Sequence, residues 1–320
     1  MSNLLFRLEP IRDESLLSFV ARTADANLLR PGDMARLAGV SADAVLPLLL
    51  GNYDSQHLAQ LLGCAREEVE YRRYLSTSDG QHSFFGVAVD RDHLCPTSRR
   101  FAPRALSRSA FHRAHWDISF IFTDRDTGEL LQSLCPECGT EQTWRSGSLV
   151  ECRECGFDIR NAPEQATPAA LKDLDVFLHG IVDPSAEVRE KTRDYLSPPL
   201  RSSGVTCLIE IMTLMGGLML KHRPDKALCI QNLILDRQIE MMMNGHRLLP
   251  DWPSSATLLI EKELSQFAKG RQKEALTFAA AVAFANRAQS KEAQTLLVEL
   301  IFRFLMKTNA AGNPGQPAIR

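Results

Sequence analysis

The residues with the clearest chemistry in this sequence are four cysteines in two closely spaced pairs, Cys135, Cys138, Cys152 and Cys155. They form a C-x2-C-x13-C-x2-C pattern, and a glycine follows each pair. Two residues between cysteines let one tight turn present both sulfurs to one ion, and zinc favours four ligands in a tetrahedron. Because the protein supplies all four ligands, no position is left for water or substrate. The pattern therefore predicts one structural Zn²⁺ ion and excludes a catalytic one.

Two other interpretations of these cysteines are weaker. A redox C-x-x-C usually stands alone at a helix start in a βαβ setting, whereas these pairs occur together. Two accidental pairs would not each carry a matching glycine. Gly139 and Gly156 allow the positive φ that a metal-binding turn needs. The two cysteine-containing turns, here called knuckles, are expected at the two ends of a short hairpin over residues 140–150.

Enzymatic signatures are absent from the rest of the sequence. It contains no G-x-x-x-x-G-K-[ST] phosphate-binding loop, no G-x-S-x-G and no H-E-x-x-H. Acidic residues are numerous, but no spacing singles out a pair for metal-dependent phosphoryl transfer. His112 and His115 could form a second metal site with His93 and Cys95, although a core or surface role is the simpler interpretation. We therefore expect a protein that is not an enzyme, and a hydrolase or nuclease is the weakest hypothesis.

Length, composition and charge bound the remaining possibilities. The 320 residues are enough for about two domains, and a 44% hydrophobic content supports an ordinary core. The net charge of −2 argues against a protein that holds DNA through a globally basic surface, so any such contact must be local or shared with partners. No apolar run approaches the roughly 20 residues of a membrane span, and no signal peptide is recognisable. We expect a cytoplasmic protein without membrane contact or disulfides.

The fold class expected from the sequence is mainly α. Residues 1–80 are predicted to form a helical, helix-turn-helix-like region, in which Asp13 caps a helix that runs to about residue 27. Residues 34–45 and 58–69 then form a near-repeat, with alanine, leucine, glycine, an acid and valine at the same five positions. Each copy predicts a helix, a glycine turn and a second helix. Ser41 is the expected cap of the second helix in the first copy.

These hairpins could read DNA or could be ordinary helical packing units. The second copy is the better DNA candidate, because Arg66, Arg72 and Arg73 lie on or after its last helix. Three glutamates in the same helix weaken that case. Two αα-hairpins with glycine C-caps are at least as good an interpretation.

Residues 81–160 are expected to hold a basic segment and the zinc ribbon. The composition predicts strands at 82–89, 118–122 and 130–134, and a turn at 126–128 would pair the last two. The most basic part of the chain lies between the strands, with aromatic residues interleaved. Its candidate contacts to nucleic acid or a partner are Arg99, Arg100, Arg104, Arg108 and Arg113. The same arginine stems could instead pack over Trp116 and the hairpin.

The C-terminal half is expected to be an all-helical domain over residues 161–307, followed by a disordered tail at 308–320. Helices are predicted near 168–179, 184–195, 202–221, 225–244, 254–269, 271–287 and 290–307. Gly245 is placed just past the end of one of them. The linker between the domains is expected in the 160s.

Several motifs in the first half form a recognisable succession. A run at residues 10–22 reads P-x-x-D-E-S-L-x-S-x-x-x-R, and Cys95-Pro96 and Arg100-x-x-Pro103-x-x-Leu106 follow it. Residues 111–116 read F-H-R-A-x-W, and two leucines at 130–131 precede the first cysteine pair. Over roughly residues 6–160 this succession resembles the TniQ/TnsD family of transposon target-selection proteins. The helical C-terminal half has no motif that matches.

One feature departs from the family pattern. Many members carry an additional zinc site that begins with a C-x2-C pair before the tryptophan segment. Here Cys95 is present, but Ser98 takes the place of its partner, and Asp124 and Thr127 stand at the later ligand positions. The resemblance therefore implies one zinc ion in this chain.

The resemblance also implies a function and partners. Family members are not transposases: they recognise a target and recruit a AAA+ ATPase, which recruits the transposase. Some bind a DNA site directly, and others dock as homodimers on a CRISPR RNA-guided effector complex, where base pairing reads the sequence. The near-neutral charge and the glutamates of the second hairpin favour such an adaptor. The alternative is a sequence-specific, zinc-containing helix-turn-helix regulator that binds DNA through the second hairpin and the arginine segment.

Overall fold

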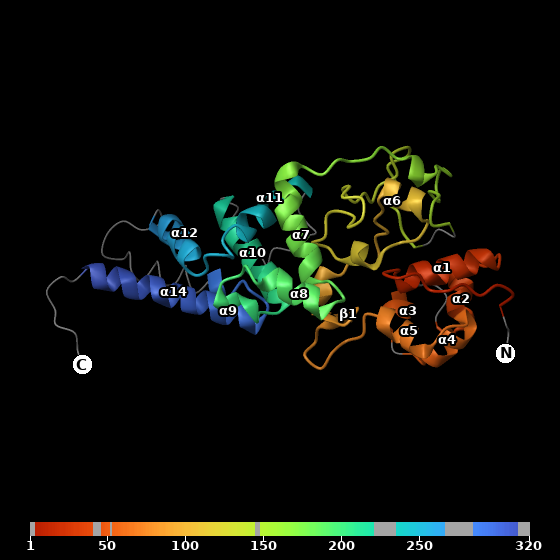
Figure 1. The fold of residues 1–320 in the computed structure, drawn as a ribbon, viewed down its shortest axis with the longest axis horizontal. Coiled ribbons are helices and arrows are strands. Elements are labelled where there is room, and N and C mark those ends of the chain that lie inside the picture. The colour runs from red at the N-terminus through yellow and green to blue at the C-terminus, as the bar shows by residue number, and fades with distance from the viewer. Residues whose placement is uncertain are drawn as a thin grey trace. The chain divides into compact units, whose positions relative to one another are not determined.

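The computed structural model describes residues 4–40, 46–51, 53–144, 148–220, 235–265 and 284–312 (Figure 1). Helices dominate these residues, and extended chain is limited there to one short hairpin and isolated bridges. The mainly α class predicted from the sequence is thus confirmed. The chain divides into two compact units, Met1–Arg189 and Glu190–Arg320.

The first unit opens with helix α1 (Leu16–Ala26), which is capped by Ser15. The Ser15 hydroxyl accepts a hydrogen bond from the amide of Ser18 (N···O 3.2 Å). The prediction that Asp13 is the cap is wrong, because Asp13 has φ 61° and an N-cap residue needs an extended backbone. Ser15 has φ −67° and ψ 150°. The helix buries Leu16, Leu17, Val20 and other apolar side chains, so it belongs to the core of the unit.

Two helical hairpins follow, and their elements are α2 (Pro31–Leu37), α3 (Leu46–Leu50), α4 (Ser55–Leu62) and α5 (Arg66–Arg72). The predicted helix, glycine and helix are present in the second copy of the repeat, where Gly63 caps α4 with φ +78°. Gly39 follows α2 in the same left-handed conformation. Ser41, the expected cap in the first copy, lies outside the described residues. Leu58, Leu62 and Val69 are fully buried, so the second hairpin is packed into the core.

The middle of unit 1 is less regular than the sequence suggests. Strands β1 (His82–Phe84) and β2 (Val87–Val89) pair with each other as an antiparallel hairpin. Short helices η1 (Arg91–His93), α6 (Pro103–Arg108) and η2 (Ala114–Asp117) follow. The strands expected at 118–122 and 130–134 are not formed: the chain makes the predicted turn, but the ladder is reduced to an isolated bridge between Thr123 and Leu130. Two backbone hydrogen bonds, from Leu131 to Phe122 and from Asp124 to Glu129, join the segments on either side of the turn.

Unit 1 continues beyond the expected linker through η3 (Ile159–Asn161), η4 (Ala169–Leu171) and α7 (Lys172–Ile181). Asp175 of α7 accepts a hydrogen bond from the Thr123 hydroxyl, and Asp183 pairs with Arg125 (Nη1···Oδ2 2.9 Å). Because these contacts hold α7 to the first unit, the division lies at 189/190, not near 160 as the sequence suggested. The finer boundaries at 80 and 307 stay predictions.

Unit 2 is built from helices. After α8 (Ala186–Arg193), which crosses the division, it contains α9 (Pro198–Arg201), α10 (Val205–Met219), α11 (Leu235–His246), α12 (Ser254–Ser265) and α14 (Lys291–Gly312). These agree with the predicted helices, although residues 221–234 and 266–283, which hold parts of four of them, lie outside the described residues. Helix α14 runs five residues (308–312) into the segment expected to be a tail, and residues 313–320 are not described.

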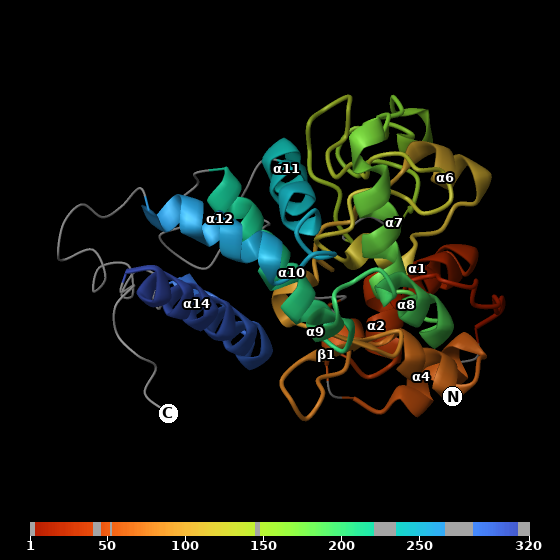
Figure 2. The same cartoon turned by 60° about the vertical axis from the view of Figure 1, so that its left-hand side comes forward.

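Helices α10 and α11 lie side by side (Figure 2) and approach closely at two glycines. A Cβ on Gly216 of α10 would lie 1.9 Å from the Met241 carbonyl oxygen, and one on Gly245 of α11 would lie 2.0 Å from that of Met212. Gly245 is therefore inside α11, where it makes a helix contact, and its predicted position past a helix end is wrong. Contact between the backbones leaves no room for a side chain.

Candidate metal centre

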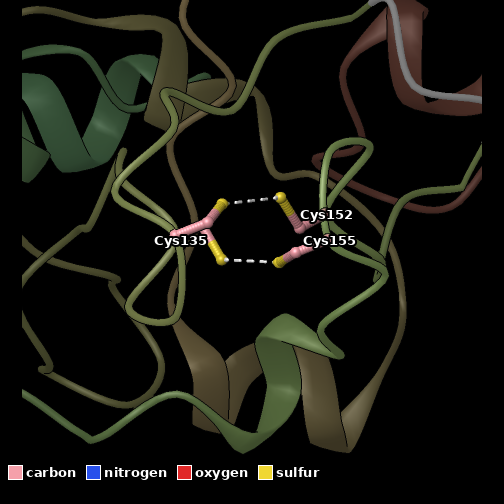
Figure 3. A group of neighbouring side chains, drawn as sticks. Cys135, Cys152 and Cys155 are labelled. Atoms are coloured by element: carbon pink, nitrogen blue, oxygen red, sulfur yellow. Dashed lines mark hydrogen bonds between the residues drawn. The ribbon is translucent and has the colours of Figure 1, made fainter.

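The four cysteines predicted to bind metal meet at one point of unit 1. Figure 3 shows their sulfur atoms facing one another from two loops. The Sγ atoms of Cys135 and Cys155 are 3.7 Å apart, as are those of Cys138 and Cys152, and all four lie within 4.8 Å of one another. Tetrahedral zinc with Zn–S bonds of about 2.3 Å places its sulfurs about 3.8 Å apart. The four cysteines thus fit a tetrahedral metal ion.

The two loops have the same local structure. The Gly139 amide donates to the Cys135 carbonyl and the Gly156 amide donates to the Cys152 carbonyl, both at 2.9 Å. Both glycines have positive φ, 70° and 72°, as the sequence predicted. Each loop is closed by its own bridge, between residues 134 and 141 and between 151 and 158. The expected arrangement, with both knuckles at the ends of one hairpin, is therefore replaced by two separately closed loops.

The surroundings favour a thiolate at Cys152 and Cys138, whereas at Cys155, despite a hydrogen bond from the Phe157 amide, burial and the neighbouring thiols raise the pKa to about 12. Burial opposes ionisation of Cys152, but the amides of Cys155 and Glu154 and the Gln142 side chain outweigh it and lower the pKa of this thiol to about 6. Thr140 lowers the pKa of Cys138 through hydrogen bonds. Thiolates are the form that binds metal, and four protein ligands complete the coordination of a structural ion.

Five of the eight arginines proposed as binding residues are buried or half-buried and have their donors turned to the protein itself. Arg99 is 2% exposed and donates to the Ser148 carbonyl (2.7 Å). Arg100 donates to three backbone carbonyls, those of residues 116, 118 and 121. Arg113 is 4% exposed and donates to the carbonyls of Phe111 and Ala105 at 3.1 and 3.2 Å.

The second hairpin places its arginines in the same way. Arg72 is buried, pairs with Glu68 and donates to the Ile11 carbonyl (3.3 Å). Arg73 is also buried, donates to a backbone carbonyl and lies 4.1 Å over the Tyr53 ring. The remaining candidates are exposed: Arg66, Arg104 and Arg108. Of these, Arg104 also donates to the Thr127 carbonyl (2.7 Å) and pairs with Glu164 (2.9 Å). A contact with DNA or a partner stays a prediction for these three.

The two motifs at residues 10–22 and 111–116 are in direct contact. The Glu14 carboxylate, which is fully buried, accepts from Arg22 (2.7 Å to each oxygen) and from the Ser18 hydroxyl (2.8 Å). Ser18 Oγ accepts from the His112 amide (2.9 Å), and Ser15 Oγ lies 3.1 Å from His112 Nδ1. Motifs that are almost 100 residues apart are thus two halves of one buried polar network.

Part of this network has the residue types of a hydrolase triad. His112 Nε2 lies 3.7 Å from Asp117 Oδ1, and Asp117 Oδ2 accepts from the Tyr74 hydroxyl (2.7 Å). Burial raises the pKa of Asp117 to about 7 and lowers that of His112 well below its usual value. However, Ser15, His112 and Asp117 are at most 2% exposed. The trio is therefore closed off from solvent and does not form an open active site in this structure.

The residues that the sequence suggested for a second metal site do not come together to form one. The Cys95 thiol lies 3.2 Å from the Asp117 carbonyl oxygen. Asp124 accepts from the Trp116 indole (3.1 Å) and from the amide and hydroxyl of Thr127 (2.9 Å each), and it faces Arg113. In the part of the chain that the structure describes, the four cysteines are the one group whose ligand atoms converge.

Gln142 is a site residue that the sequence did not indicate. Its side chain donates to the Cys152 sulfur (3.4 Å) and accepts from Arg99 (3.1 Å). A glutamine between two cysteine pairs has no distinctive spacing. Its contact with residue 99 depends on tertiary pairing, so no signal in the sequence alone could have identified it.

Comparison with known proteins agrees with the N-terminal motifs. Residues 5–123, which are less than half of the chain, match the family model described as TniQ, and this match supports membership of the TniQ family. A TniQ domain implies a role in target selection for transposition. A stretch of 26 residues, 8% of the chain, is 50% identical to the DNA-directed RNA polymerases II, IV and V subunit 12 of Arabidopsis thaliana and spans about half of that protein (51%). None of the described helices has the length and apolar character needed to cross a bilayer.

Proposed function

We propose that this protein is a non-catalytic adaptor for target selection in transposition. It links a recognised target, either a DNA site or a CRISPR RNA-guided effector complex, to a AAA+ ATPase and through it to a transposase. The TniQ domain supports the transposition setting. The observation that favours an adaptor over a DNA reader is the inward placement of five of the eight candidate arginines.

The exposed surface of the second hairpin supports the same choice. Helix α5 exposes Arg66, but this side chain lies 3.8 Å from Glu70 and shares the surface with Glu67 and Tyr71. Carboxylates on a helix face are repelled by the phosphates that line a groove. A sequence-specific helix-turn-helix regulator therefore remains the second candidate, carried only by the helix–glycine–helix geometry of α4 and α5.

The proposal includes one structural Zn²⁺ ion held by the four cysteines. Their sulfur separations and the four-thiol ligand set support zinc, because tetrahedral S₄ sites are typical of it. It also includes a cytoplasmic location and self-association as a homodimer where an effector complex is the target. These last points rest on the family resemblance.

A salt titration of binding to random duplex DNA tests the choice between the two candidates. The logarithm of the binding constant falls with that of salt concentration with a slope of about −0.9 per neutralised phosphate. Three exposed arginines allow a slope of about −3, which is a loss of about 40-fold between 50 and 200 mM salt. Eight arginines would give about −7, a loss of about 20,000-fold.

The adaptor proposal expects weak binding and the shallow slope. Arg108→Gln should reduce the slope by about one at most. Micromolar binding at physiological salt with the steep slope would favour the DNA-binding regulator and contradict the adaptor.

A further inference from the structure

Arg99 is a buried cation without a carboxylate partner. It is 2% exposed, and its guanidinium donates to neutral oxygens: two backbone carbonyls and the Gln142 side-chain oxygen. Its Nε is buried and has no hydrogen-bond partner. In the described residues no carboxylate lies within 4.0 Å of it. An isolated buried charge is strongly unfavourable, so an anion is expected nearby.

Other buried arginines of this unit show what is missing at Arg99. Arg72 pairs with Glu68, Arg73 with Glu70 (3.3 Å), and Arg113 lies 3.4 Å from Asp124. Each of these cations therefore has a carboxylate of its own. Arg99 is the exception among them. Its neighbour Gln142 contacts the cysteine cluster, so the cluster is the group to consider as its partner.

The path from Arg99 to the cluster has two hydrogen bonds. Arg99 Nη2 donates to Gln142 Oε1 (3.1 Å), and Gln142 Nε2 donates to Cys152 Sγ (3.4 Å). The backbones also meet, because the Arg99 amide donates to the Gln142 carbonyl (2.8 Å) and Ser98 forms a bridge with Thr143. Four thiolates around Zn²⁺ carry a net charge of about −2, which is the anion that the guanidinium lacks.

We infer that Arg99 is the buried counter-charge of the zinc–cysteine cluster and, through Gln142, a positioning residue that ties the cluster to the TniQ domain. Residue 99 lies within the matched domain (5–123), whereas the four ligands lie beyond it. Loss of zinc frees Cys152 from the cluster, and with it the sulfur that Gln142 contacts. Metal occupancy therefore controls how firmly the ribbon is held against the domain.

Zinc affinity of the full-length protein tests this inference, measured by competition with a chromophoric chelator. Arg99→Met and Gln142→Met should each weaken zinc binding by about 10- to 100-fold, the usual effect of removing a partner of a metal ligand. Arg99→Lys should restore part of the loss. The matched control is Arg160→Met, since Arg160 is an exposed arginine near the ribbon that pairs with Asp158 (2.6 Å).

Substitution of cobalt for zinc adds a spectroscopic measurement of the metal–sulfur bonds. This spectrum would not change if Arg99 and Gln142 only stabilised the fold. The sulfur-to-cobalt charge-transfer bands should shift in Gln142→Met and Arg99→Met and stay unchanged in Arg160→Met. Wild-type zinc affinity and an unshifted spectrum in both variants would overturn the inference.

If Arg99→Met does not fold, the wild type decides the question by hydrogen exchange with and without zinc. The Arg99 amide should exchange faster in the metal-free protein while amides in α1 keep their protection. Equal protection of the Arg99 amide in both forms would overturn the inference.

Discussion

Replacement of Arg113 by alanine distinguishes a structural arginine from a DNA-binding one. Arg113 lies in the basic segment that the sequence suggested as a binding surface, yet it is 4% exposed. Its guanidinium lies 4.4 Å over Phe111 and 5.1 Å over Trp116, and its Nε is 3.4 Å from the buried Asp124 carboxylate. Alanine would remove all of these contacts together with the hydrogen bonds to two carbonyls.

The size of the effect follows from what is left behind. Removal of one partner of a buried ion pair costs about 3–5 kcal/mol. Asp124 keeps hydrogen bonds from Trp116 and Thr127, so we expect the lower end, about 3 kcal/mol. That is a large share of the 5–15 kcal/mol that stabilises a typical domain. For a unit of this size the melting temperature should fall by roughly 6–12 °C.

Urea denaturation and duplex binding of the same samples provide the assay. Arg108→Ala is the matched control, because Arg108 is exposed on α6 in the same segment, and its stability should stay within about 0.5 kcal/mol of wild type. Wild-type stability of Arg113→Ala combined with weaker DNA binding would refute the reasoning and return Arg113 to the binding surface.

Three further predictions concern other parts of the chain. Burial raises the pKa of Asp117 from 3.8 to about 7, so its protonated form stabilises the fold at low pH and this contribution is lost as pH rises through about 7. In wild type, the free energy of unfolding should therefore fall by up to about 4 kcal/mol between pH 4 and 7 through this group, and Asp117→Asn should remove that fall. Urea titrations at several pH values measure it, and the same pH profile in the variant and wild type would count against the prediction. Gly216→Ala should destabilise unit 2 by about 2 kcal/mol or more, because its Cβ would meet the Met241 carbonyl, and calorimetry showing an unshifted transition would disprove the close helix contact. Cys152→Ser should remove bound zinc, as measured by atomic absorption, and full zinc content would rule out the four-cysteine site.

Local patterns in the sequence were sufficient for the features that depend on near neighbours. The four ligands and their glycines are within five residues of one another in each loop, so their spacing alone predicts the geometry that the structure shows. The helix, glycine and helix of α4 and α5 follow from the same kind of short-range pattern. The start of α1 was misplaced by two residues, because a serine and an aspartate are equally good caps and only the backbone angle at Asp13 decides between them.

Features that depend on distant partners could not be predicted. The basic segment looks like a DNA-binding surface in the sequence. Only the fold shows that Arg99 and Arg100 donate to backbone carbonyls of later segments and that Arg113 faces the buried Asp124. The expected linker near residue 160 has a loop-like composition. The contacts of Thr123 and Arg125 with residues in and after α7 carry the first unit past it. Contacts between side chains that are more than 50 residues apart leave no periodic pattern in the sequence from which they could be predicted.

Recruitment of the AAA+ transposition ATPase is the most direct test of the central claim. Sedimentation of the zinc-loaded protein with the ATPase at physiological salt, without DNA, should show a complex of the two proteins. Neither protein alone should form a complex with random duplex DNA. High-affinity binding of this protein to a specific DNA sequence, with no association with the ATPase, would contradict the adaptor and establish the DNA-binding regulator in its place.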